Sequence, residues 1–237
     1  NPIMVLDDIE GIKNILSLSK NSGVKRVFYS SSSEVYGEPF VIPQNENNTP
    51  LNSRLPYAIV KNVGEAFFKS YYQEYGLEYT IFRFFNTYGP NQSEDFVVPR
   101  FIKAALKNEP ITLYGDGLQT RSFCYVDDLV NGIHKLLFSD YNYPVNLGNP
   151  EEITIIEFAK EILELTKSNQ KIDFRPLPVG DPLRRQPDIS LAKNELNWQP
   201  TTSRLDGMKK TFEYFSCLPK EKLYKTDHKD FSKHIKI

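Results

Sequence analysis

The sequence lacks the features that mark membrane proteins and nucleic-acid-binding proteins. It contains no apolar run approaching about eighteen residues and no signal-peptide pattern. Its 29 Lys and Arg are balanced by 30 Asp and Glu, which gives a formal net charge of −1. Because neither sign of charge dominates, we expect no nucleic-acid partner and no membrane partner. We therefore predict a cytoplasmic location.

Residues that bind metals are also sparse. The two cysteines, Cys124 and Cys217, are far apart in the sequence and have no metal-ligand spacing around them. The three histidines lack such spacing too. Both cysteines are expected to be reduced thiols with a structural role. The sequence therefore predicts no metal site.

A glycine-rich dinucleotide fingerprint is missing as well. Neither G-x-G-x-x-G nor G-x-x-G-x-x-G occurs among the 237 residues. In parallel α/β domains this turn brings the backbone close to a pyrophosphate at a helix N-terminus. The chain as given is therefore expected to bind a dinucleotide poorly.

A run of hydroxyls follows the first apolar segment. Val27–Tyr29 is succeeded by four serines, then Glu34, and then a Tyr-Gly pair. This pattern predicts a buried strand that starts near Lys25 and leaves its sheet at the serines. Ligands of open parallel sheets bind where the strands end, so hydroxyls and a carboxylate are well placed there for chemistry.

Tyr57 and Lys61 stand four residues apart at the start of a helical pattern, so both project from one helix face. A free tyrosine has a pKa near 10, and a neighbouring lysine cation would favour the phenolate. Such a tyrosine could take the proton of a substrate hydroxyl while hydride passes to NAD⁺. Ser32 would hold that hydroxyl in line. These three residues predict a proton-handling triad.

Four stretches of the chain together resemble a known family. SSSSEVYG, PYAIVK, FNTYGP and GDGLQTRSFCYV are similar to motifs of the extended short-chain dehydrogenase/reductases, specifically the NAD-dependent nucleotide-sugar epimerases, dehydratases and decarboxylases. The resemblance implies an α/β fold, with a Rossmann-type parallel sheet and a small mixed substrate-binding domain. It also implies NAD as the cofactor and a UDP-linked nucleotide sugar as the substrate.

The resemblance assigns roles to individual positions. The residues that it implies are, for catalysis, Ser32, Glu34, Tyr57 and Lys61; for the cofactor, Ser30, Tyr57, Lys61 and Phe84; and for the substrate, Ser33, Asn86, Arg121 and Arg185. Within this scheme the arginines suit phosphates or a sugar acid, because a guanidinium offers paired donors.

Some of these positions have a structural alternative. Asn86 could satisfy its own backbone in a turn, and Arg121 could be a solvated turn residue. Arg185 could belong to a solvated charge cluster in which Asp188 caps the next helix. Asp127 and Asp128 are expected to cap a helix over Leu129–Phe138 and receive no catalytic role. For Asn86, Arg121 and Arg185 the surrounding motifs favour the functional interpretation.

The resemblance also divides the chain. Residues 1–90 and 122–148 are assigned to the remainder of the NAD-binding domain, 91–121 and 149–216 to the substrate domain, and 217–237 to a polar tail. Tyr57–Tyr75 carries a broad apolar stripe, more than packing on one sheet requires. The family uses this helix and its neighbour, here Leu6–Asn21, for a dimer contact, so a homodimer is expected.

Glu34 helps to choose between the possible reactions of the resembling family. It stands two residues before the tyrosine of the VYG signature. The resembling decarboxylases and 4,6-dehydratases carry Glu at this place. The stretches PVNLGNPEEITIIEFA and RRQPDI resemble UDP-glucuronate decarboxylases most closely. A 4-epimerase, which PYAIVK resembles, and a 4,6-dehydratase are the alternatives within the family. A third alternative is a reductase that releases NADP.

The missing fingerprint leaves one alternative of another class. The sequence could be an N-terminally incomplete piece of a longer enzyme, or a non-catalytic nucleotide-sugar-binding protein whose cofactor half has decayed. The intact downstream motifs favour the incomplete enzyme.

Overall fold

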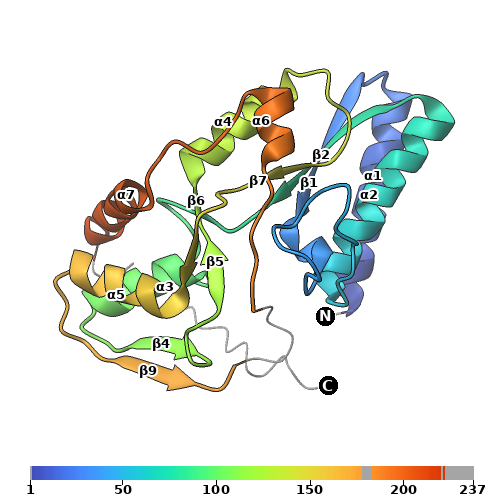
Figure 1. Cartoon of the computed structure of the whole chain (residues 1–237). Helices are drawn as coiled ribbons and strands as arrows, with labels where there is room; N and C mark the ends of the chain where they lie inside the picture. The colour runs from blue at the N-terminus through green and yellow to red at the C-terminus, as the bar shows by residue number, and fades with distance from the viewer. Residues whose placement is uncertain (1, 178–182, 220, 222–237) are drawn as a thin grey trace.

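Three parallel strands form the centre of the computed structural model, which describes residues 2–177, 183–219 and 221. They are β1 (Arg26–Ser32), β2 (Glu78–Phe84) and β7 (Val145–Leu147), in the order β1-β2-β7 (Figure 1). The expected break at the serines is wrong, because β1 continues through them and Ser32 pairs with Phe84. Ladder bonds are made by the backbone, so small hydroxyl side chains do not prevent pairing. The carboxyl ends of β1 and β2 therefore lie side by side.

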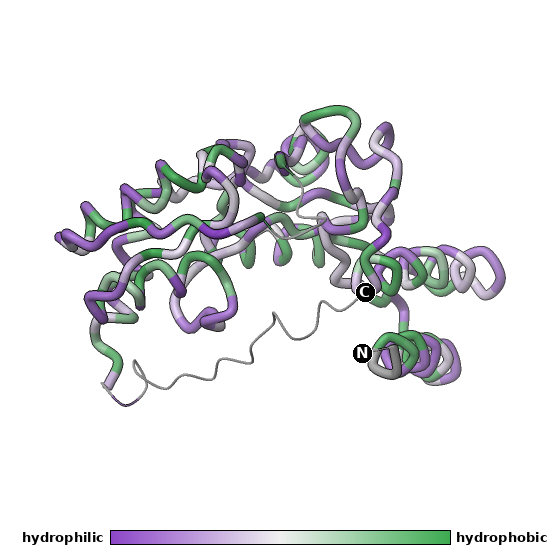
Figure 2. Tube along the Cα trace, turned by 90° about the horizontal axis from the view of Figure 1, so that it is seen from below, coloured by the Kyte–Doolittle hydropathy of each residue, from purple (hydrophilic) through white to green (hydrophobic). Residues whose placement is uncertain are grey.

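Helices cover both faces of this sheet. On one face α1 (Pro2–Asn21) and α2 (Pro56–Tyr75) pack through Leu16, Tyr29 and Phe68. On the other face α4 (Val126–Leu137) and α6 (Ser190–Leu196) pack around Leu136 and Trp198. Figure 2 shows α1 and α2 together at one side of the molecule, each with hydrophobic and hydrophilic residues. A parallel sheet with both faces covered by helices confirms the expected α/β class.

A second group of elements has its own core. Its helices and strands are α3 (Val97–Leu106), α5 (Ile155–Leu165), α7 (Arg204–Ser216), the parallel pair β4 (Ile111–Tyr114) and β9 (Ile172–Arg175), and the antiparallel pair β5 (Thr120–Ser122) and β8 (Glu152–Thr154). The buried aromatic rings of Phe101, Phe123 and Phe158 are at the centre of this core. Two short parallel strands, β3 (Thr87–Tyr88) and β6 (Cys124–Tyr125), lie between the two groups.

The predicted domain division differs from this packing at α6 and also at Phe123, which was assigned to the first unit but packs in the second core. Residues 149–216 were assigned to the second unit, yet α6 and Trp198 pack against α4 and β7 of the first. The buried Trp198 indole donates to the carbonyl oxygen of Asp128 at 2.9 Å. Burial of a large aromatic side chain with a satisfied N–H explains why the chain returns to the first unit here. Residues 220 and 222–237, most of the predicted tail, lie outside the described residues.

One of the two predicted helix caps is present in the structure and the other is not. Thr154 and Glu157 form the predicted capping box at the start of α5. The predicted capping of α4 by Asp127 and Asp128 is wrong, because α4 begins at Val126 and no side chain caps it. The Asp128 carboxylate instead accepts hydrogen bonds from the backbone N–H groups of Thr201 and Thr202, at 3.0 and 2.9 Å. Asp128 therefore holds the segment between α6 and α7 against α4 through hydrogen bonds.

Three further features concern the described residues only. No helix among them has the length and apolar character needed to cross a membrane. Within the same residues no cluster of three or more acidic, histidine or cysteine side chains could hold a metal ion. Cys124 is buried, Cys217 is exposed, and both are free thiols.

Candidate active site

Ser32, Tyr57 and Lys61 meet at the end of β1. Pro56 occupies the first turn of α2, where its missing N–H breaks no helical bond, and so Tyr57 lies at the very start of that helix. Lys61, one turn further, donates from Nζ to the carbonyl oxygen of Ser30 at 2.8 Å. The Lys61 Nζ also lies 5.5 Å from the centre of the Tyr57 ring. The tyrosine and the lysine are thus gathered at the sheet edge where β1 ends.

Burial and neighbouring groups shift the pKa values of both Tyr57 and Lys61. Burial raises the pKa of Tyr57, an interaction with Ser32 lowers it, and the charge of Glu34 raises it further. Burial also lowers the pKa of Lys61. The expected support of the phenolate by Lys61 remains a prediction. The Lys61 ammonium is directed to the Ser30 carbonyl oxygen.

A short 3-10 helix, η1 (Ser33–Tyr36), carries Glu34 beside this group. Ser32 caps η1 by accepting a hydrogen bond from the Glu34 backbone N–H at 3.2 Å. The Glu34 carboxylate then receives two bonds from the guanidinium of Arg185, at 2.6 and 3.0 Å. Arg185 is only 5% exposed. The alternative of a solvated charge cluster is therefore wrong for Arg185.

The charged neighbours of Arg185, Arg184 and Asp188, have structural partners within the protein. Arg184 is bound to Glu152, with donor–acceptor distances of 3.2 and 2.5 Å. Asp188 accepts from the Ser190 backbone N–H at 2.8 Å and from Asn45 at 3.0 Å. Arg184 and Asp188 thus hold the segment in place, while Arg185 alone points to Glu34.

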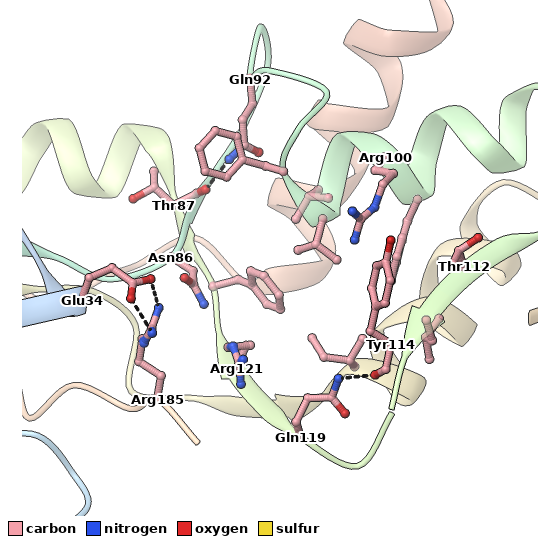
Figure 3. Close-up of a pocket in the computed structure, with 17 residues that line it drawn as sticks. Glu34, Asn86, Thr87, Gln92, Arg100, Thr112, Tyr114, Gln119, Arg121 and Arg185 are labelled. Carbon is pink, nitrogen blue, oxygen red and sulfur yellow. Dashed lines mark hydrogen bonds and ion pairs between the residues drawn. The ribbon is translucent and has the colours of Figure 1, made fainter. Parts of the chain in front are cut away.

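A cavity of about 320 Å³ adjoins these residues. Four of the predicted positions line it, namely Glu34, Asn86, Arg121 and Arg185 (Figure 3). Arg121 is buried on the strand β5 and is no solvated turn residue, which makes that alternative wrong too. It donates to the carbonyl oxygen of Thr120 at 2.8 Å. Residues distant in sequence are thus brought to one hollow between the two groups of elements.

Six predicted positions do not line this cavity. Three of them, Ser32, Tyr57 and Lys61, are the group at the end of β1, and the other three are Ser30, Ser33 and Phe84. The Ser33 residue is 3% exposed. Phe84 is half-buried with its ring against that of Phe82, at 4.7 Å between centres. Ser30 has an exposed side chain, and its carbonyl oxygen binds Lys61. Their contacts with substrate or cofactor remain predictions.

A buried ionic network beneath the site was not anticipated from the sequence. Arg83 on β2 donates from Nε and Nη2 to the two carboxylate oxygens of Glu65 on α2, at 2.9 and 2.6 Å. Ser31 donates to Glu65 at 2.6 Å, and Arg83 Nη1 donates to the Tyr36 hydroxyl at 2.9 Å. One arginine therefore ties the helix of Tyr57 to the 3-10 helix of Glu34. A lone charge inside the apolar strand EYTIFRF was the signal available in the sequence.

The network continues to the segment that carries Arg185. The Tyr36 hydroxyl donates to Asn146 at 2.7 Å, and the Asn146 amide donates to the carbonyl oxygens of Gln44 and Asp188. Gln44 in turn accepts from the Asp188 backbone N–H and donates to the Gln186 carbonyl, both at 2.8 Å. The spacing between Tyr57, Glu34 and Arg185 is therefore fixed by one hydrogen-bonded unit.

The far end of the cavity was also not anticipated. It is lined by Arg100 on α3, by Thr112 and Tyr114 on β4, and by Gln119. In Figure 3 these side chains lie across the cavity from the Glu34–Arg185 pair, with Arg121 between. The sequence indicated a helix, a strand and a turn here, but periodicity alone does not tell which side chains face a shared hollow.

Comparison with known proteins gives a family match and close relatives. The model of the NAD dependent epimerase/dehydratase family matches residues 3–148. UDP-glucuronic acid decarboxylase 1 of Danio rerio is 44% identical over 223 residues, 91% of this chain and 53% of the relative. UDP-glucuronic acid decarboxylase 6 of Arabidopsis thaliana is 40% identical over 215 residues, 88% of this chain and 62% of the relative. The chain thus spans about half the length of the curated relatives it matches.

Solved structures agree in fold. UDP-glucose 4-epimerase from Thermotoga maritima, crystallised with UDP-glucose, superposes with a TM-score of 0.85 at 31% identity, over 88% of this chain and 69% of that one. UDP-glucuronic acid 4-epimerase from Bacillus cereus, in complex with UDP-glucuronic acid and NAD, gives 0.82 at 28% identity, over 87% and 66%.

Proposed function

The chain belongs to the NAD-dependent epimerase/dehydratase family, and from this premise we propose that it forms the catalytic part of a UDP-glucuronate decarboxylase. The observation that carries the proposal is the bidentate Glu34–Arg185 pair, which lies in the cavity beside Ser32 and Tyr57. The matched relatives at 40 to 44% identity, which are UDP-glucuronic acid decarboxylases, support the same choice.

The residues at the sheet edge suit NAD. The Lys61 ammonium has three donors and uses one on Ser30, so two N–H groups remain for the hydroxyls of a ribose. Tyr57, 54% exposed, offers its hydroxyl at the same edge. When bound, NAD⁺ would take hydride from the sugar C4 and later return it. The glycine-rich turn that holds the pyrophosphate is not among these 237 residues.

The first step assigned to this chain is removal of a proton. Tyr57, as the phenolate, takes the proton of the C4 hydroxyl while the C4 hydrogen leaves as hydride. Ser32 holds that hydroxyl in line by hydrogen bonding. Lys61 supports the phenolate through its charge and holds the ribose. The C4 carbon is thereby oxidised to a ketone.

The second step is loss of carbon dioxide. After oxidation the C6 carboxylate is β to the C4 ketone, so the electrons of the breaking C5–C6 bond move into an enolate. Arg121, with its guanidinium in the cavity wall, would hold the sugar acid or the phosphates. Glu34, held by Arg185, and Arg121 would orient the acid and assist delivery of a new proton to C5 in place of the lost CO2. Hydride supplied by the bound cofactor would reduce the C4 ketone and give a UDP-pentose, with Tyr57 giving its proton back to the C4 oxygen.

A 4-epimerase is the second candidate. It shares the first step, and it is favoured by the two solved epimerases that superpose over most of this chain. In that reaction the C6 group is kept and hydride returns to the opposite face of C4. A 4,6-dehydratase would instead use Glu34 to remove the C5 proton.

One experiment separates these candidates. The full-length protein is incubated with NAD⁺ and UDP-glucuronate, and CO2 and the mass of the product are followed. We expect loss of the mass of CO2, abolished by Tyr57→Phe. An unchanged mass with a new stereoisomer would identify an epimerase. Loss of water from a neutral nucleotide hexose would identify a dehydratase, and binding without turnover would support the non-catalytic alternative.

A homodimer formed through α1 and α2 is part of the proposal. Large apolar side chains remain exposed on these helices, including Leu6 at 65% and Leu18 at 62% on α1, and Tyr75 at 50% on α2. Exposed apolar patches of this kind mark interaction surfaces in soluble proteins. Light scattering of the full-length protein should give twice the monomer mass, and Leu18→Glu should reduce it. The cytoplasmic location and the assignment of residues 1–90 with 122–148 to the cofactor remain predictions.

A further inference from the structure

Arg100 is a cation in the cavity wall that has no polar partner in the described part of the chain. It lies on α3, is half-buried, and lines the cavity. Its guanidinium lies near two aromatic rings, with the central carbon 5.6 Å from the ring centre of Tyr114 and 5.9 Å from that of Phe101. Its Nε is shielded from solvent without a hydrogen-bond acceptor. By contrast, Arg185 in the same cavity has a carboxylate partner.

An arrangement of this kind is unfavourable unless a ligand completes it. An arginine cannot lose its proton in a protein, and a buried charge without a partner is costly. Burial lowers the pKa of Arg100, and the nearby Tyr114 raises it. Among the described residues the shielded Nε–H of Arg100 therefore lacks an acceptor, and a ligand in the cavity could supply one.

The position of Arg100 indicates which part of a nucleotide sugar it meets. The reacting sugar must lie near Glu34, because Glu34 follows Ser32 and its charge acts on Tyr57. Arg121, between the two ends of the cavity, suits the diphosphate (Figure 3). The nucleobase is then left at the far end, where the Tyr114 ring offers a stacking surface and Arg100 stands beside it.

We propose that Arg100 is a specificity-determining residue that donates a hydrogen bond to the 4-position carbonyl oxygen of uracil and thereby selects uridine over cytidine nucleotides. The inference rests on the proposed nucleotide-sugar function. Arginine has donors only, whereas cytosine presents an amino group where uracil has the carbonyl. A cytosine would therefore set its amino donor against the guanidinium donor.

Binding of UMP and CMP, measured by calorimetry on the full-length protein, tests this directly. Wild type should prefer UMP by about tenfold to a hundredfold, the range for one good polar contact to a base. Arg100→Gln, whose amide both donates and accepts, should bring the two affinities within about threefold of each other. Arg100→Lys keeps a donor-only cation and should retain part of the preference. Arg175→Leu, a loss of the same charge at an exposed site outside the cavity lining, should change nothing.

Three outcomes would overturn the inference. The first is a wild type that binds UMP and CMP equally or binds neither. The second is an Arg100→Gln variant that keeps the UMP preference. The third is an equal loss of UMP, CMP and inorganic pyrophosphate binding in Arg100→Gln, which would make Arg100 a phosphate ligand. Because no turnover is needed, a protein that selects UMP through Arg100 yet releases no CO2 would refute only the proposed reaction.

Discussion

At the scale of single residues, the proposed base is set by competing influences on one phenol. Burial raises the pKa of Tyr57, the interaction with Ser32 lowers it, and the negative charge of Glu34 raises it. Lys61 donates to the Ser30 carbonyl oxygen, and its Nζ lies 5.5 Å from the centre of the Tyr57 ring. Burial and the Glu34 charge therefore raise the pKa of Tyr57 on balance, and a cation near the ring favours the phenolate against this rise.

This balance predicts opposite shifts in the pH dependence of two variants. Only the phenolate accepts a proton, so the rate should rise with pH through the pKa of Tyr57. Removing the Ser32 hydroxyl by Ser32→Ala should move this rising limb to higher pH. Removing the Glu34 charge by Glu34→Gln should move it to lower pH. Rate measurements over a pH series check both directions, and movement of both limbs the same way would contradict the assignment of Tyr57.

At the scale of elements, α2 is held on the sheet by an ion pair and by one glycine. The Glu65–Arg83 pair has side chains only 8% and 4% exposed. Gly64 faces Tyr29 so closely that a Cβ there would lie 2.1 Å from the Tyr29 hydroxyl oxygen. Both contacts set how far the helix of Tyr57 and Lys61 stands from β1.

Removing Arg83 should be costly, because a buried carboxylate would lose its partner. We expect Arg83→Met to lower the free energy of unfolding by about 3–5 kcal/mol. The double variant Arg83→Met, Glu65→Met leaves no charge behind and should lose clearly less. Urea denaturation of both proteins measures the difference. A double variant as unstable as the single one would mean that lost packing, and not the orphaned charge, sets the effect.

The glycine gives a second prediction for α2. Gly64→Ala forces the helix or the Tyr29 ring to move, and we expect a loss of about 1–3 kcal/mol, typical of overpacking. Gly11→Ala on α1 is the matched control, since its Cβ would meet no atom within 4 Å. That change should stabilise the helix by about 0.5–1 kcal/mol, because alanine loses less backbone entropy. Equal effects of the two substitutions in thermal unfolding would contradict the close contact.

At the scale of the whole molecule, the cavity exists because two groups of elements meet. Glu34 and Arg185 are 151 positions apart, and their ion pair joins the end of β1 to the segment that precedes α6. The wall opposite them comes from α3 and β4 of the second group. A ligand in this hollow would touch both groups, so its binding should stabilise them together.

The two proposed ligands should therefore affect the 237-residue polypeptide differently. UMP at about a hundredfold excess over its dissociation constant should add about 2.7 kcal/mol to the free energy of unfolding. NAD⁺ should add much less, because the sequence contains no glycine-rich turn for its pyrophosphate. Thermal unfolding with each ligand measures both effects. A larger shift with NAD⁺ than with UMP would contradict the view that the nucleotide-sugar cavity is the more complete site.

The sequence by itself determined what is decided by neighbouring residues. The helical face shared by Tyr57 and Lys61, the strand EYTIFRF and the capping box of Thr154 follow from local periodicity and local hydrogen bonds. The recurring motifs likewise identified the family. Where the serine run was expected to end β1, the pairing partner on β2 decided otherwise, and no local pattern contains that partner.

Only the tertiary structure decided which distant side chains share one environment. The pairing of Glu34 with Arg185, the burial of Arg83 on Glu65, and the solitary position of Arg100 each depend on how separate elements pack. A charged side chain has the same local pattern whether it faces water, a carboxylate or an aromatic wall. Its energy, and hence its role, is set by the dielectric and the partners that packing brings to it.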